Sequence, residues 1–121
     1  MPREYRFTDE DRTRSREKEQ ARRDRINSLP RQWGHEEKET TFAMFNWCCG
    51  YCEAPETDVK LEFDHFINIY EDTCPGTIPG NMVPSCRSCN RRKGNLGAET
   101  ILSLDKMKEV KSILASLGGV W

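Results

Sequence analysis

The stretch that decides the fold covers residues 49–94 and reads CGYCEAPETDVKLEFDHFINIYEDTCPGTIPGNMVPSCRSCNRRKG. It contains a Cys-x-x-Cys pair at each end, Cys49/Cys52 and Cys86/Cys89. Each pair supplies two sulfurs from one tight turn, and four thiolates suit a tetrahedral zinc site without an open position for water. The spacing therefore predicts a structural Zn²⁺ that holds the two ends of this segment together.

The zinc ligand set leaves one alternative open, because Cys48 could replace Cys49 with a Cys-x-x-x-Cys spacing. We take Cys49 as the ligand, so that Cys48 and Cys74 are spare thiols, expected to be buried rather than functional. Disulfides are the other interpretation, and they need an oxidising compartment. The chain starts with charged residues and shows no signal peptide and no apolar run of membrane-span length. We therefore expect a cytoplasmic, bacterial or phage-encoded protein with reduced thiols.

The composition predicts one small domain with a thin core. The chain has 121 residues, of which 36% are hydrophobic and 32% charged, and a domain this short and polar needs a staple such as a metal. The formal net charge of −1 divides into +3 over residues 1–34, −8 over 35–75 and +4 over 76–121. A polyanion would contact the basic segments, but the overall charge alone does not indicate nucleic-acid binding.

The pattern of apolar residues predicts an α+β fold. Residues 59–64 alternate apolar and polar side chains, as a strand does, and residues 81–84 form a short second strand that should stop at Pro84. A loop is expected over 66–80, a helix around the second cysteine pair that ends at Gly94, and one further helix over 98–117 with Leu104 and Leu114 on its apolar stripe.

The N-terminal part is expected to form a charged helix. Thr8 and Asp11 are spaced for a capping box, and the helix should end near residues 27–30. It lacks an apolar stripe, so it either docks on DNA or a second subunit, or it frays. Residues 35–41 are expected to be a connection. The resulting division is a helix and connection over 1–40, a core over 41–96 and a C-terminal helix that packs on the core over 97–121.

Four polar residues between or beside the cysteines carry potential chemistry: Asp64, His65, Asn81 and Asn90. Histidine can act as a general base near neutral pH. The oxygens of Asp64 and Asn90 suit Mg²⁺ or Mn²⁺, and a cation held there could contact a phosphate. Each residue also has a structural interpretation: a lone histidine after a strand is often structural, Asn81 follows a glycine and suits a turn, and a basic run is often a solvated helix face.

The order of the cysteine pairs and these four polar residues along the chain resembles that of the HNH endonuclease family, over about residues 47–95. The resemblance implies a ββα-metal fold around one catalytic cation. His65 would be the general base, Asn81 would hold the loop and orient the imidazole, and Asp64 and Asn90 would ligate the cation. Phosphate contacts to DNA would come from the basic residues Arg87, Arg91, Arg92 and Lys93.

The activity implied is one-metal hydrolysis of phosphodiester bonds, which gives 5′-phosphate and 3′-hydroxyl ends. The loop departs from the family pattern, because Phe66-Ile67-Asn68 replaces the common His-Ile-x-Pro opening, and substrate contacts there stay open. Two rival interpretations remain: a non-catalytic zinc-stapled nucleic-acid-binding module, and an assembly protein with a degenerate core. One such unit cuts one strand, so double-strand cleavage needs a homodimer or a second visit. Partner proteins of a phage or mobile element are the other partners considered.

Overall fold

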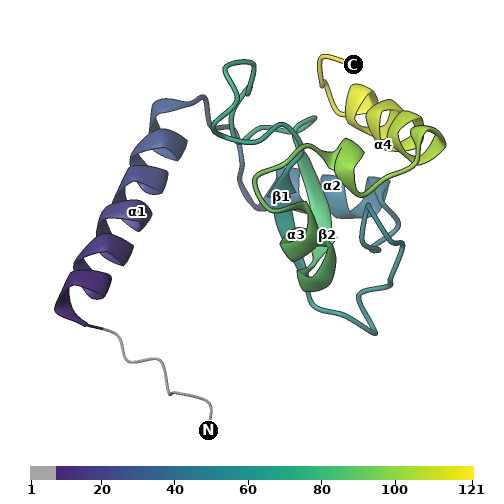
Figure 1. The fold of residues 1–121 in the computed structure, drawn as a ribbon. Coiled ribbons are helices and arrows are strands. Elements are labelled where there is room, and N and C mark those ends of the chain that lie inside the picture. Colours follow the sequence, from purple (N-terminus) through teal and green to yellow (C-terminus); the bar gives the residue numbers. More distant parts are fainter. Residues whose placement is uncertain (1–7) are drawn as a thin grey trace, which may run out of the picture.

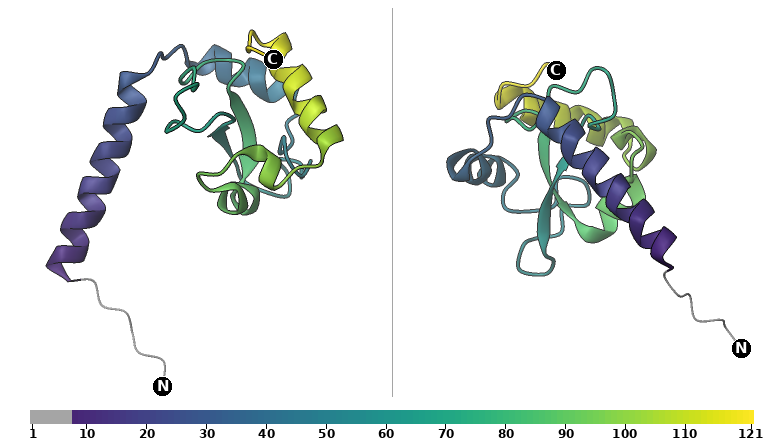
Figure 2. Two further views of the ribbon diagram at one scale, coloured as in Figure 1. Left: turned by 45° about the horizontal axis from the view of Figure 1, so that its top comes forward. Right: turned by 90° about the vertical axis from the view of Figure 1, so that its left-hand side faces the viewer.

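The structure, a computed structural model, describes residues 8–121 (Figure 1). Its elements confirm the α+β prediction and are, in chain order, α1 (Asp9–Ser28), α2 (His35–Met44), β1 (Leu61–His65), β2 (Met82–Cys86), α3 (Arg87–Lys93), a 3₁₀ turn η1 (Ala98–Thr100) and α4 (Leu104–Ser116). The small sheet lies at the centre, with α1 on one side of it and α4 on the other (Figures 1 and 2). No helix within residues 8–121 is long and apolar enough to cross a membrane.

The sheet is a single antiparallel pair, β1 with β2, in a register that places Leu61 opposite Cys86 and His65 opposite Met82. The prediction that β2 stops at Pro84 is wrong, since the strand continues through it. The carbonyl of Pro84 accepts a hydrogen bond from Gly50 N at 2.7 Å, on the side away from β1. The N and C=O of one strand residue point the same way, so the N–H that proline lacks is not one that β1 needs.

Helix α1 begins at the predicted capping box. Thr8 Oγ1 accepts from Asp11 N, and the Asp11 carboxylate accepts from Thr8 N, both at 3.1 Å. No residue of α1 is buried. Its last turns are nevertheless attached, because the guanidinium of Arg25 donates to the main-chain carbonyls of Ile69 and Glu71. The helix therefore docks on the 66–80 loop by its C-terminal end.

The expectation of a connection over residues 35–41 is wrong, because these residues form most of helix α2. The acidic residues Glu36 and Glu37 that suggested a loop occupy the first helical turn, where they complement the helix dipole, and Glu37 accepts from Gly34 N at 3.3 Å. Thr41 and Phe45 follow at a spacing of four and are both buried. The helix is thus stabilised by contacts with the core.

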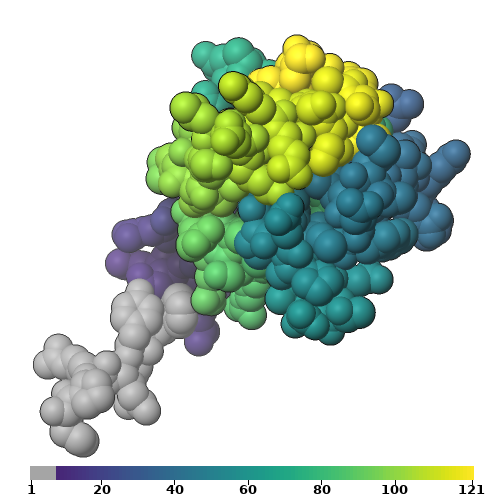
Figure 3. All heavy atoms as spheres, turned by 90° about the vertical axis from the view of Figure 1, so that its right-hand side faces the viewer, coloured from purple at the N-terminus to yellow at the C-terminus, as the bar shows by residue number. Residues whose placement is uncertain are grey.

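The single helix expected over 98–117 is broken into η1 and α4. Ser103 caps α4 by accepting from Lys106 N at 3.2 Å, which starts a new helix after the turn. Leu114 is buried as predicted and Val110 is buried beside it, whereas Leu104, the first residue of α4, is 81% exposed although it is expected on the apolar stripe. Figure 3 shows the C-terminal residues covering one end of the molecule beside the blue and teal residues of the 40–60 region. This helix closes the small core.

Candidate metal centre and active site

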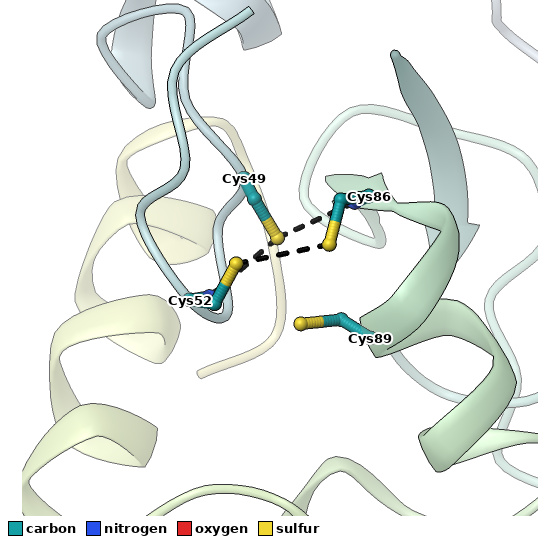
Figure 4. Close-up of side chains that lie close together, drawn as sticks. All are labelled: Cys49, Cys52, Cys86 and Cys89. Carbon is teal, nitrogen blue, oxygen red and sulfur yellow. Dashed lines mark hydrogen bonds between the residues drawn. The ribbon is translucent and has the colours of Figure 1, made fainter. Parts of the chain in front are cut away.

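The two Cys-x-x-Cys pairs converge in space (Figure 4). Cys49 and Cys52 come from the turn before β1, and Cys86 and Cys89 from the junction of β2 with α3. The four Sγ atoms lie within 4.8 Å of one another, and Cys52 Sγ is 3.7 Å from Cys86 Sγ. A tetrahedral zinc with Zn–S bonds of about 2.3 Å separates its sulfurs by roughly 3.8 Å. The cluster therefore fits a structural Zn²⁺.

Donors around the sulfurs favour their thiolate form. Cys49 Sγ accepts from Cys86 N at 3.4 Å and from Cys52 N at 3.5 Å, and the guanidinium of Arg92 lies 3.9 Å from Cys89 Sγ. Burial and the neighbouring sulfurs raise the pKa of the Cys89 thiol, so the sulfurs need a cation to become thiolates together.

The structure also decides which cysteines are spare. Cys48 lies outside the cluster and donates to Asn46 O at 3.2 Å, so Cys49 belongs to the four-sulfur set. Cys74, within the 66–80 loop, is buried as expected, whereas Cys48 is only partly buried.

A second site lies at the end of β1. Asp64 and His65 from β1 and Asn90 from α3 line one hollow of about 190 Å³. The rest of its lining comes from the loop after β1, from the end of α3 and from helix α1: Asn68, Ile69, Gly94, Asn95 and Arg22. Asn81 does not line the hollow. The structure thus brings together three of the four residues singled out for catalysis.

Asp64 is held by two partners. Tyr51 donates its hydroxyl to Asp64 Oδ2 at 2.7 Å, and the ammonium of Lys93 lies 3.0 Å from the same oxygen. Burial, followed by the charge of Asp64, raises the pKa of Tyr51 well above its usual value, so its hydroxyl remains a donor. Because Tyr51 sits inside the first Cys-x-x-Cys turn, it connects the zinc cluster with the end of β1.

The expectation that Lys93 contacts a DNA phosphate is wrong. Its side chain is 1% exposed, and its ammonium also donates to His65 O at 3.1 Å. It is turned into the protein and is not available to a DNA phosphate. The other basic residues of this segment, Arg87, Arg91 and Arg92, are exposed on α3.

His65 is half-buried, and its Nε2 lies 2.9 Å from Thr77 Oγ1. Burial lowers the pKa of the imidazole, the carboxylate of Asp64 opposes this shift, and the cations Arg22, Lys93 and Arg31 add to it. The ring is therefore neutral at neutral pH, which is the form that can accept a proton.

Asn81 is fully buried and holds the 66–80 loop. Its Oδ1 accepts from Ile67 N at 2.8 Å, and its Nδ2 donates to Gly76 O at 3.0 Å. The imidazole of His65 is hydrogen-bonded to Thr77, the residue after Gly76, and not to Asn81. Asn81 thus reaches the histidine only through the loop that it fixes.

Sequence reasoning missed three residues of this site: Arg22, Tyr51 and Thr77. Arg22 is one of many charged residues in α1, and nothing in the sequence distinguishes it from the others. Tyr51 could have been found from its place between two ligand cysteines, which keeps it near the sheet. Thr77 lies in a loop without periodicity, and only the tertiary structure places it against His65.

Comparison with known proteins gives a family match over this part of the chain. Residues 49–96 match the family model described as HNH endonuclease. Comparisons with curated proteins and with solved structures found no match. The matched segment contains both cysteine pairs together with Asp64, His65, Asn81 and Asn90, and helices α1, α2 and α4 lie outside it. Such a domain indicates a nuclease or a nucleic-acid-binding function. Residues 49–96 are therefore similar to HNH endonuclease domains, and this segment contains a four-cysteine cluster that fits zinc.

Proposed function

We propose that the chain is a DNA endonuclease that hydrolyses phosphodiester bonds with the help of a divalent cation. The observation that carries the proposal is that Asp64, His65 and Asn90, all within the segment that matches the HNH family, line one hollow. A half-buried neutral histidine beside a carboxylate and an amide is a useful arrangement for hydrolysis, and a purely structural zinc module does not require it.

The residues at the hollow fit a hard cation. Both partners of Asp64 use Oδ2, and within residues 8–121 no hydrogen bond or ion pair engages Oδ1. Asp64 through Oδ1 and Asn90 through its amide oxygen would hold Mg²⁺ or Mn²⁺. When bound, the cation supplies positive charge that stabilises the leaving 3′-oxygen.

The protein's own groups perform the proton transfer. We assign the tautomer in which His65 Nε2–H donates to Thr77 Oγ1, which leaves the lone pair of Nδ1 free. Nδ1 takes a proton from water, and the water oxygen attacks phosphorus in line with the leaving 3′-oxygen. The P–O3′ bond breaks, the 3′-oxygen takes a proton from solvent, and the products carry 5′-phosphate and 3′-hydroxyl ends.

The test is nicking of supercoiled plasmid with the purified zinc-loaded chain, in Mg²⁺, in Mn²⁺ and in chelator. We expect cation-dependent nicking that His65→Ala abolishes, with zinc content and thermal unfolding unchanged. His35→Ala is the matched control, because His35 is an exposed histidine on α2, outside the HNH domain. Nicking by His65→Ala at the wild-type rate would sink the proposal.

The second candidate is a non-catalytic nucleic-acid-binding module. The buried ammonium of Lys93 favours it, because this cation already neutralises Asp64 and weakens the attraction for a second one. The same assay discriminates: wild-type protein that binds a duplex without nicking it in either cation supports the binding module.

One HNH domain provides one catalytic centre, so we propose that a single chain nicks one strand. Double-strand cleavage would need two copies, through a homodimer or through successive visits. Light scattering gives the stoichiometry, and a monomer that linearises plasmid without a nicked intermediate would contradict single-strand nicking.

A further inference from the structure

Helix α1 has a fixed position beside the active-site hollow although it lies outside the HNH match. Its last turns are attached to the 66–80 loop, because Arg25 donates to Ile69 O and, at 3.2 Å, to Glu71 O. Ile69 itself lines the hollow. Figures 1 and 2 show α1 on one side of the sheet and α3, with its C-terminal end nearest to the rest of the molecule and its N-terminal end pointing away. The attachment therefore determines which side chains of α1 face the catalytic residues.

Arg22 is the side chain that the attachment brings to the hollow. It precedes Arg25 by three residues, so the two lie on one face of the helix. Together with Asp64, His65 and Asn90, Arg22 lines the hollow of about 190 Å³.

Within the part of the chain that the structure describes, no carboxylate pairs with the guanidinium of Arg22. Its neighbour Arg23 pairs with Glu19 at 3.3 Å, and Arg25 is engaged with carbonyls. Within residues 8–121, Arg22 makes neither an ion pair nor a hydrogen bond, and its side chain is exposed. Asp64 could have served as a partner, but its carboxylate is already paired with Lys93. An exposed, unpaired guanidinium at a catalytic hollow is available to an external anion.

We propose that Arg22 binds the scissile phosphate of the DNA strand in this hollow, and that α1 is therefore part of the nuclease site. The proposal rests on the proposed function. The Asp64–Lys93 pair has no net charge. Arg22 is therefore the residue that gives the lining of the hollow a net positive charge. Guanidinium matches two phosphate oxygens at once, which gives orientation as well as charge.

The test compares Arg22→Ala and Arg22→Lys with Arg23→Ala, which removes the same charge one residue further along the helix and away from the hollow. Single-turnover nicking by the zinc-loaded full chain is the measurement. We expect Arg22→Ala to slow nicking on the order of 100-fold, as for other lost transition-state donors. Arg22→Lys should recover part of the rate, because it restores the charge without the fork. Arg23→Ala should stay within about twofold of wild type.

Circular dichroism and thermal unfolding accompany the rates, since the contacts of Arg25 remain in every variant and α1 should stay docked. Equal nicking by Arg22→Ala and Arg23→Ala overturns the proposal. If wild-type protein nicks plasmid with neither cation, the proposed function fails, and DNA-binding measurements then decide the role of Arg22.

These measurements record duplex affinity against salt concentration in the presence of chelator. Compared with Arg23→Ala, Arg22→Ala should lose about one phosphate contact, which reduces the slope of log affinity against log salt by ~0.9. Equal slopes for the two variants would overturn the proposal that Arg22 binds phosphate.

Discussion

The ammonium of Lys93 lies 3.0 Å from Asp64 Oδ2, in a pair whose side chains are only 1% and 11% exposed. The same ammonium donates to His65 O, so one lysine from the end of α3 holds both residues at the end of β1. Since α3 also carries Cys89 and Asn90, the pair joins the zinc cluster to the candidate active site. Lys93 is a structural partner of the site's carboxylate, and the exposed arginines of α3 are left to contact solvent or ligand.

Lys93→Met should destabilise the fold, because it leaves a nearly buried carboxylate without its counter-charge while keeping much of the apolar stem. Breaking such a pair costs about 3–5 kcal/mol in the free energy of unfolding. Denaturant titration of zinc-loaded protein measures the loss, and Lys108→Met, an exposed position on α4, is the control. Adding Asp64→Asn to Lys93→Met should recover part of the loss. A change no larger than that of the control would contradict this role.

Removing the metal should unfold the HNH core. Zinc binding to four thiolates supplies about 10–16 kcal/mol in small zinc domains, more than a thin core provides by itself. We expect one zinc per chain by elemental analysis, and loss of the thermal transition after treatment with a strong chelator. Persistence of the cooperative transition in metal-free protein would refute a stabilising role.

Single cysteine variants identify the ligands. Cys89→Ser should lose zinc, because it removes one of the four clustered sulfurs. Cys48→Ser should keep a full equivalent, because Cys48 Sγ bonds instead to Asn46 O. The opposite result for Cys48 would restore it as an alternative to Cys49.

Asn81→Ala should loosen the 66–80 loop. The change leaves Ile67 N and Gly76 O without their buried partner, which costs about 2–4 kcal/mol in the free energy of unfolding. Hydrogen exchange provides the local readout, since the amide of Ile67 should lose protection before the amides of the sheet. Asn27→Ala, at an exposed position near the end of α1, serves as the control. Unchanged protection at Ile67 would show that the loop is held by other contacts.

Gly76→Ala should disturb the approach of the loop to the segment after α1. Gly76 has φ +106°, and an added Cβ would lie 2.1 Å from Pro30 O, which cannot move without the backbone. Gly118→Ala is a matched control with φ +95°, where a Cβ meets no atom of residues 8–121 within 4 Å. We expect about 1 kcal/mol of strain at Gly118 and clearly more at Gly76. Equal melting temperatures of the two variants would contradict the close approach.

Features governed by nearby residues could be predicted from the sequence. The capping box at Thr8, the helix end at Gly94 and the alternation that forms β1 depend on neighbours within a few positions. The cysteine set was readable for the same reason, because each pair forms its own turn and the chemistry of sulfur indicates a shared metal. The order of the remaining polar residues supported the HNH resemblance.

Only the tertiary structure decided which polar groups face one another. Helix α2 forms where acidic residues suggested a loop, because Thr41 and Phe45 find a core to pack against. Lys93 turns inward because Asp64 lies behind it, and Arg22 reaches the hollow because Arg25 finds carbonyls 44 and 46 residues away. These contacts depend on the packing of segments that are distant in the sequence, so local sequence patterns do not predict them. The two cysteine pairs at the ends of residues 49–94 could be identified in the sequence, but the surroundings of the candidate catalytic residues required the fold.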